Sequence, residues 1–195
     1  MILPDSPDYD AARRLADPRF DNVLPQAVVR CGTPTDVAEA IALARRHGLH
    51  AVPRSGGHSF AGRSTSTGVI IDVAPMHDVR PDGDFAVIGA GARLGEVYDG
   101  LARVGRTIAA GCGPAVGIAG LTLGGGLGIL GRSHGLTSDQ LVAARVVLPD
   151  GRIVECDDRR EPDLFWALRG SGGGNFGVVT SLTFRTLPVP PSTVL

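Results

Sequence analysis

The sequence predicts an α+β fold, on three observations. Short apolar segments typical of strands alternate irregularly with amphipathic helical segments, so a regular βαβ array is not expected. The chain has 195 residues, and 43% of them are hydrophobic, which is enough to bury a core. Its 28 glycines and 14 prolines indicate many loops and tight turns.

The first half of the chain contains the best-marked helix, which begins after Thr33. Thr33 is suited to cap the helix, Pro34 occupies the first helical position, and Asp36 stands three residues after the cap. The apolar face recurs at helical spacing and consists of Val37, Ala40, Ile41 and Ala44. We expect the helix to end at Gly48, and we expect a further helix at 8–16 and strands at 27–30, 50–52 and 68–73.

The second half is predicted to contain more strands than helices. A helix at 95–104 would place Val97, Leu101 and Val104 on one side. A turn at Pro149-Asp150-Gly151 marks a hairpin. The remaining expected elements are strands at 85–91, 141–149, 152–156 and 177–187 and a helix at 162–170. The tail from Pro188 is expected to leave the domain.

Charge excludes several functional classes. All 19 basic residues are arginine, so a P-loop lysine, a Schiff-base lysine and a pyridoxal-phosphate lysine are excluded. The net charge of −1 gives no electrostatic reason to expect nucleic acid or an anionic membrane as a partner.

The cysteine spacing predicts no metal site, and neither the uncharged segment nor the N-terminus predicts a membrane segment. Cys31, Cys112 and Cys156 form no CxxC pair, so neither a metal site nor a disulfide framework is predicted. Residues 107–131 carry no charge, but nine of these 25 residues are glycine, which favours a ligand cradle over a membrane helix. The N-terminus lacks the features of a signal peptide, and a cytoplasmic location is the default expectation.

Four glycine-rich loops are the main functional signal: residues 55–59, 111–117, 120–128 and 170–177. Each by itself is explained by turn glycines, but four together fit a long phosphate-bearing ligand held by backbone N–H groups, such as a dinucleotide. Two segments match GxGxxG, yet one follows more glycine and the other leads into a strand. A Rossmann site is therefore not expected.

His58 stands out within the first of these loops, between Gly57 and Ser59. It is either an ordinary surface-loop histidine or a nucleophile or proton-transfer group. His134 is a weaker candidate of the same kind.

The segment Arg54-Ser55-Gly56-Gly57-His58-Ser59 resembles the signature of FAD-linked oxidases with the fold of p-cresol methylhydroxylase and vanillyl-alcohol oxidase. The nearest subfamily is the berberine-bridge-enzyme-like group. The resemblance continues, in order, through residues 69–73, 89–98, 116–141, 146–154 and 163–185. It implies one FAD-binding domain made of two α+β subdomains, residues 1–81 and 82–195, with FAD between them.

The resemblance also implies which residues contact FAD. His58 matches the histidine that is bonded to the flavin 8α-methyl group, where an imidazolyl substituent raises the reduction potential of the flavin. Loop 54–59 and the glycine run would cradle the pyrophosphate and approach the isoalloxazine, and the later residues would line the adenosine and ribitol. The implied set is Arg54, Ser55, Gly56, Gly57, His58, Ser59, Gly111, Cys112, Gly113, Val116, Gly117, Gly120, Leu121, Gly124, Gly125, Gly126, Gly128, Asp139, Leu141, Gly177, Val178 and Val179.

The sequence departs from the family pattern beside Cys112. Many members attach the flavin through a second residue, a cysteine, and alignment on Val116-Gly117 places that cysteine at Gly113. Since Cys112 stands one position early, we predict attachment through His58 only. A loop shifted by one residue would bring in Cys112, and otherwise it is an inert thiol. Val116 matches the position that gates oxygen, and valine there favours an oxidase.

Members of this family are much longer and carry a separate substrate domain that supplies the catalytic base. No catalytic residue is therefore identified in this chain, and an apolar surface facing such a domain is expected. The resemblance predicts an oxidase that passes substrate hydride to FAD and then to O2, giving hydrogen peroxide. The alternative is a non-catalytic flavin-binding fragment, or half of a split enzyme that needs a partner chain.

Overall fold

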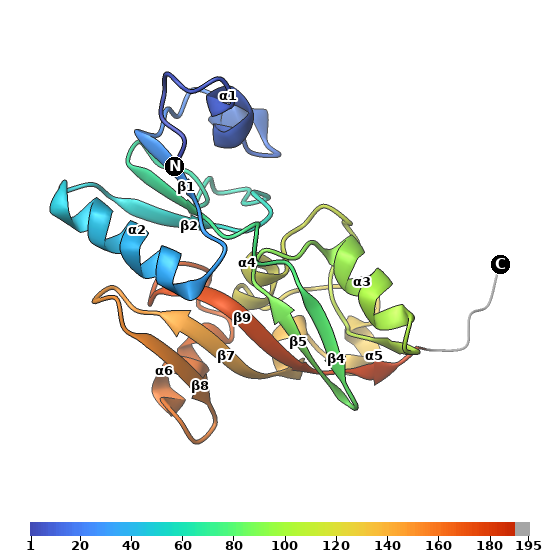
Figure 1. Cartoon of the computed structure of the whole chain (residues 1–195). Helices are drawn as coiled ribbons and strands as arrows, with labels where there is room; N and C mark the ends of the chain where they lie inside the picture. Colours follow the sequence, from blue (N-terminus) through green and yellow to red (C-terminus); the bar gives the residue numbers. More distant parts are fainter. Residues whose placement is uncertain (190–195) are drawn as a thin grey trace.

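A computed structural model describes residues 1–189 and shows two main sheets with helices around them, besides one two-stranded sheet (Figure 1). The α+β class is thus confirmed. The smaller sheet is parallel, in the order β1 (Ala27–Arg30), β3 (Val69–Asp72), β2 (Ala51–Arg54). The larger is antiparallel, in the order β4 (Val79–Asp82), β5 (Phe85–Gly89), β9 (Val178–Arg185), β7 (Leu141–Val147), β8 (Ile153–Asp157).

Helix α2 (Pro34–Arg46) lies between the two sheets and packs against β3 and β7 (Figure 1). Its predicted cap is confirmed. The amide of Asp36 donates to Thr33 Oγ1 at 3.1 Å, and the Asp36 carboxylate accepts from the Thr33 amide at 2.9 Å. The buried face of α2 joins one apolar core that extends through both sheets. The helix therefore ties the two halves of the chain together.

The larger sheet is built on β9, which pairs with β5 on one side and β7 on the other. Its inward side chains, among them Ile88, Leu182 and Phe184, are fully buried. Two helices accompany this sheet, α3 (Leu94–Ala102) and α6 (Pro162–Leu168). The short strands β6 (Arg106–Thr107) and β10 (Leu187–Pro188) pair with each other.

The N-terminal segment covers the face of the parallel sheet opposite α2 (Figure 1). It contains α1 (Tyr9–Arg13) and the 3-10 turn η1 (Pro18–Phe20), so the helix is shorter than the predicted 8–16. The Tyr9 hydroxyl donates to the Pro25 carbonyl at 2.6 Å and anchors α1. Ala12 joins Val28, Val52 and Ile70 in a small second cluster.

Several expectations about elements were wrong. Strand β4 was missed because VRPD is an exposed edge strand with a proline. Helix α4 (Ile118–Leu123) was missed because it lies in the glycine run and forms only with tertiary packing, since Ile118 and Leu123 are buried. Val104 lies beyond the end of α3 and is 54% exposed.

The two remaining short elements are α5 (Gly131–His134) and η2 (Thr137–Gln140). The subdomain division expected between residues 81 and 82 falls inside β4, and the chain passes from one sheet to the other between Asp72 and Val79. Most of the tail expected after Pro188 lies outside the described residues. Across residues 1–189, no helix combines the length and the apolar character needed to span a bilayer.

We expect Thr33→Ala to lower the free energy of unfolding by about 1 kcal/mol, because the amide of Asp36 loses its capping acceptor. Urea denaturation measures the change. Thr35→Ala is the matched control, since Thr35 is exposed one position inside the helix and its hydroxyl caps nothing. Equal losses in the two variants would contradict the capping role.

Candidate functional site

A cavity of about 410 Å³ lies where three glycine-rich segments meet. They are the loop that follows β2, the start of α4, and the loop between α6 and β9. The cavity is thus lined by segments that lie more than a hundred residues apart in the sequence. The expected site residues that line it are Arg54, Ser55, Gly56, Gly57, His58, Ser59, Val116, Gly117, Gly120, Leu121, Gly177 and Val179.

The first two segments touch backbone to backbone at Gly56 and Gly117. A Cβ added at Gly56 would lie 2.3 Å from the Gly117 nitrogen, and one added at Gly117 would lie 2.2 Å from the Gly56 nitrogen. Neither glycine has a positive φ, so glycine is required here because a side chain would not fit, and not because of the backbone conformation. The Ser55 hydroxyl fixes the same junction by donating to the Ala90 carbonyl at 2.6 Å.

Both segments present amide groups with no protein acceptor anywhere in residues 1–189. The first segment is an open loop, and the second is the first turn of α4, where backbone donors have no intrahelical partner and the N-cap Gly117 offers no side chain. The free donors are the N–H groups of Gly56, Gly57, His58 and Ser59, and those of Gly117, Ala119 and Gly120. Such clusters of N–H groups bind anions, phosphates in particular.

Arg54 lines the cavity, but its guanidinium is engaged elsewhere. The side chain is 6% exposed, donates to the carbonyls of Ala12 and Arg13 at the end of α1, and lies 3.7 Å from the Asp72 carboxylate. Burial lowers the pKa of Arg54, and the nearby Asp72 carboxylate opposes that effect. The residue expected to contact the cofactor therefore holds α1 against the parallel sheet.

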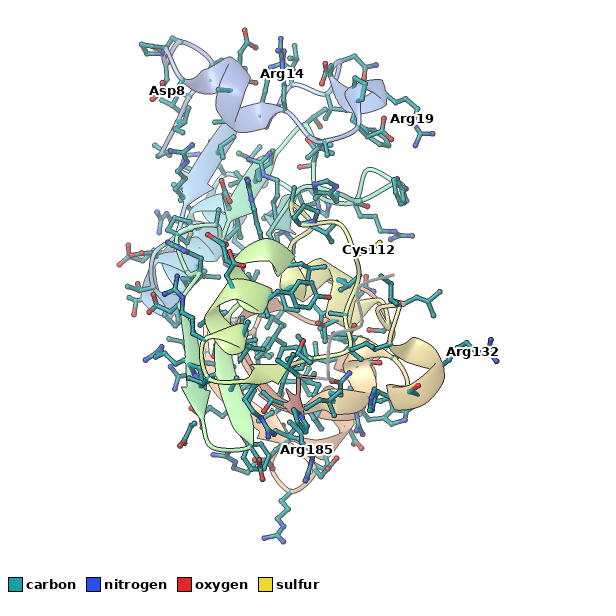
Figure 2. The ribbon with its side chains drawn as sticks, turned by 90° about the vertical axis from the view of Figure 1, so that its right-hand side faces the viewer. Asp8, Arg14, Arg19, Cys112, Arg132 and Arg185 are labelled. Carbon is teal, nitrogen blue, oxygen red and sulfur yellow. The ribbon has the colours of Figure 1, made fainter. Side chains whose placement is uncertain are left out.

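His58 lines the cavity, and within the described residues its imidazole makes no hydrogen bond. Cys112 is exposed and is not among the lining residues (Figure 2). The Tyr98 hydroxyl donates to the carbonyl of Gly111 at 2.6 Å and fixes the loop in front of Cys112. Burial raises the pKa of Tyr98, so it remains a donor at neutral pH. His58, the expected attachment residue, therefore lines the cavity, and the alternative residue Cys112 does not.

The second half of the glycine run packs against protein instead of lining the cavity. A Cβ at Gly128 would lie 1.8 Å from the Ala110 carbonyl oxygen, and one at Gly126 would lie 2.4 Å from Thr137 Oγ1. The Asp139 carboxylate accepts from the Leu136 amide at 2.8 Å and caps η2. The expected site residues outside the cavity lining are Gly111, Cys112, Gly113, Gly124, Gly125, Gly126, Gly128, Asp139, Leu141 and Val178.

The set of expected site residues also omitted part of the cavity lining. The loop between α6 and β9 is one of the four expected glycine loops, but of its cavity-lining glycines only Gly177 was among the expected site residues. The side chains after Ser59 carried no motif. The omitted lining residues are Pro53, Phe60, Arg63, Ser64, Val73, Ala119, Leu123, Gly172, Gly173 and Gly174.

A model of the FAD binding domain matches residues 25–157. The chain belongs to this family of FAD-binding domains. It is 36% identical over 193 residues to (R)-6-hydroxynicotine oxidase of Paenarthrobacter nicotinovorans, covering 97% of this chain and 42% of that protein. The chain spans less than half the length of the curated relatives it matches.

Two solved structures extend the likeness to the fold. The BBE-like 1 protein of Physcomitrella patens superimposes with a TM-score of 0.93 at 35% identity, over 96% of this chain and 42% of that chain. Glucooligosaccharide oxidase from Acremonium strictum gives a TM-score of 0.87 at 35% identity, over 94% of this chain and 39% of that chain. The expected resemblance to berberine-bridge-like FAD-linked oxidoreductases is confirmed.

We expect Gly117→Ala to lower the free energy of unfolding by about 1–3 kcal/mol, because its Cβ would overlap the backbone of Gly56. The same variant should retain less FAD. Urea denaturation and the flavin absorbance of the purified chain measure the two effects.

Gly120→Ala in the same helix is the matched control for stability. No atom lies within 4 Å of a Cβ there, and alanine favours a helix over glycine by up to about 1 kcal/mol. A Gly117→Ala chain as stable as the parent would contradict the close approach.

Proposed function

We propose that the cavity binds FAD, as the cofactor domain of a flavin-dependent oxidase. The observation that carries the proposal is the pair of free amide clusters, after β2 and at the start of α4, on one cavity. A pyrophosphate matches this donor set, since it accepts many hydrogen bonds and carries the negative charge that helix N-termini favour. The glycines at 56 and 117 fit the same ligand, because they leave no side chain at the junction.

Different residues of the chain would then bind different parts of the cofactor. The amides of residues 56–59 and of the first turn of α4 would hold the phosphates, while Val116 and Leu121 supply apolar wall. The Arg54 guanidinium would keep β2 and α1 together below this loop. When bound, FAD supplies an acceptor for substrate hydride, and O2 is the proposed final electron acceptor.

His58 is the proposed point of covalent attachment. It lies in the cavity with a free imidazole, as an attacking nitrogen requires. The FAD of the glucooligosaccharide oxidase from Acremonium strictum is described as 6-S-cysteinyl, 8α-N1-histidyl. Cys112 is outside the cavity lining, which supports a single link through His58.

A second candidate is a flavin-binding unit that has no activity until a further domain or partner chain supplies a substrate site. The observation that favours it is the exposure of apolar side chains beyond α4, where Leu127 is 78% and Ile129 is 83% exposed. Peroxide formation by the purified chain that depends on an added oxidisable substrate and exceeds one peroxide per flavin would reject this candidate.

We expect flavin fluorescence to remain with the polypeptide on an acid-treated denaturing gel. Fluorescence should disappear in His58→Ala, because the only proposed attachment nitrogen is removed, and should persist in Cys112→Ala. The FAD content of each native variant, measured by absorbance before denaturation, separates loss of the bond from loss of binding.

Loss of fluorescence in Cys112→Ala with retention in His58→Ala would contradict the attachment site. A parent chain that contains no flavin after expression and takes up none when FAD is added would contradict the proposed function itself.

A further inference from the structure

The amide clusters of the cavity carry no net positive charge. A pyrophosphate within a dinucleotide carries negative charge at neutral pH, whereas backbone N–H groups are dipoles without net charge. The chain has no lysine, and the donors of Arg54 are directed to Ala12, Arg13 and Asp72. A side chain of the cavity wall that has no other partner would add positive charge to these amide groups.

Arg63 is the other arginine among the lining residues. It is exposed, and within residues 1–189 its guanidinium takes part in no ion pair and no hydrogen bond. By contrast, Arg19 and Arg13 on the neighbouring N-terminal segment are both bound to aspartates. The charge of Arg63 is thus available to a ligand.

The loop that carries Arg63 is held in a defined shape. The amide of Gly62 donates to the Ser59 carbonyl at 3.1 Å, and the amide of Arg63 donates to the Ser59 hydroxyl at 3.1 Å. Gly62 has φ +70°, and a Cβ there would lie 2.4 Å from the ring of Phe20. Arg19 also donates to the Phe60 carbonyl at 3.2 Å. These contacts connect Arg63 rigidly to the free amides that end at Ser59.

The next two residues leave polar atoms without partners. The hydroxyl oxygens of Ser64 and Thr65 are buried and have no hydrogen-bond partner within the described residues. A buried hydroxyl without a partner is unfavourable, and such atoms commonly mark a missing ligand or water. Ser64 belongs to the cavity wall and Thr65 does not.

We propose that Arg63 and Ser64 form a further phosphate contact of the cavity, in which the Arg63 guanidinium pairs with the ligand's phosphate oxygens and the Ser64 hydroxyl donates to them. This inference rests on the proposed binding of FAD and extends it beyond the glycine loop to the segment 59–64. It assigns the countercharge of the site to one side chain.

The test is the affinity of the chain for ADP, compared with adenosine as the phosphate-free probe, by calorimetry at low and high ionic strength. The background is His58→Ala, so that bound flavin exchanges and can be removed. Arg63→Gln should weaken ADP binding by about tenfold at low ionic strength, as expected for one charge-assisted contact, and should flatten its salt dependence. Adenosine binding should be unchanged, and Arg63→Lys should restore part of the affinity.

Ser64→Ala should show two effects of opposite sign. It removes a buried hydroxyl without a partner, so the melting temperature of the ligand-free chain should rise, while ADP binding weakens by about threefold. Thr65→Val is the matched control, which should raise the melting temperature without a change in ADP binding. Arg132→Gln, at an exposed arginine on α5, controls for overall charge (Figure 2).

Unchanged ADP affinity in Arg63→Gln, or equal loss in Arg63→Gln and Arg132→Gln, would overturn the proposal. Equal ADP affinity in the His58→Ala background with and without Ser64→Ala would remove Ser64 from it. A parent chain that binds neither FAD nor ADP would instead refute the proposed function, so the two failures are distinguishable.

Discussion

The close approach of Gly56 and Gly117 is the contact on which the site depends. It brings the loop after β2, in the half of the chain built on the parallel sheet, against the first turn of α4, in the half built on the antiparallel sheet. Any side chain at either position would separate them. With both absent, two groups of residues with unpaired amides line one cavity, and neither half has both groups by itself.

In the proposed site, backbone dipoles hold the phosphates, since the guanidinium of Arg54 is already engaged by other groups. Arg54 is buried against α1 and Asp72, which stabilises the base of the loop but leaves little of its charge for a ligand. Removing one partner of such a buried pair is costly, so Arg54 is better understood as support for the loop than as a contact. Free charge at the cavity then rests on Arg63, on a loop that turns and N-terminal contacts hold in place.

Local signals predicted the elements that local interactions stabilise. Helix α2 was predicted with its cap because Thr33 and Asp36 interact within one turn. Helix α4 was not, because its glycines disfavour a helix and only burial of Ile118 and Leu123 stabilises it. Likewise, the motif around His58 predicted the loop of the cavity, whereas nothing in the sequence indicated that Gly126 and Gly128 pack on Thr137 and Ala110.

The direction of side chains was the other feature of the site that the sequence could not predict. Arg54 and Cys112 lie within or beside the glycine loops of the sequence. The Arg54 guanidinium nevertheless points to α1, and the Cys112 thiol lies outside the cavity lining. The sequence could not predict the proposed roles of Arg63 and Ser64. These roles follow from the absence of a partner for the Arg63 guanidinium and the Ser64 hydroxyl, which only the structure shows.

The most direct test of the central claim is a ¹H–¹⁵N correlation spectrum of the flavin-free His58→Ala chain during titration with FAD. The account predicts that the amide resonances of residues 56–59, 117, 119 and 120 shift together, because these N–H groups gain acceptors. Those of Gly83 and Gly151, in open turns with no atom near a Cβ, should stay in place. Shifts confined to other residues, with both amide clusters unmoved, would contradict the claim that they hold the ligand.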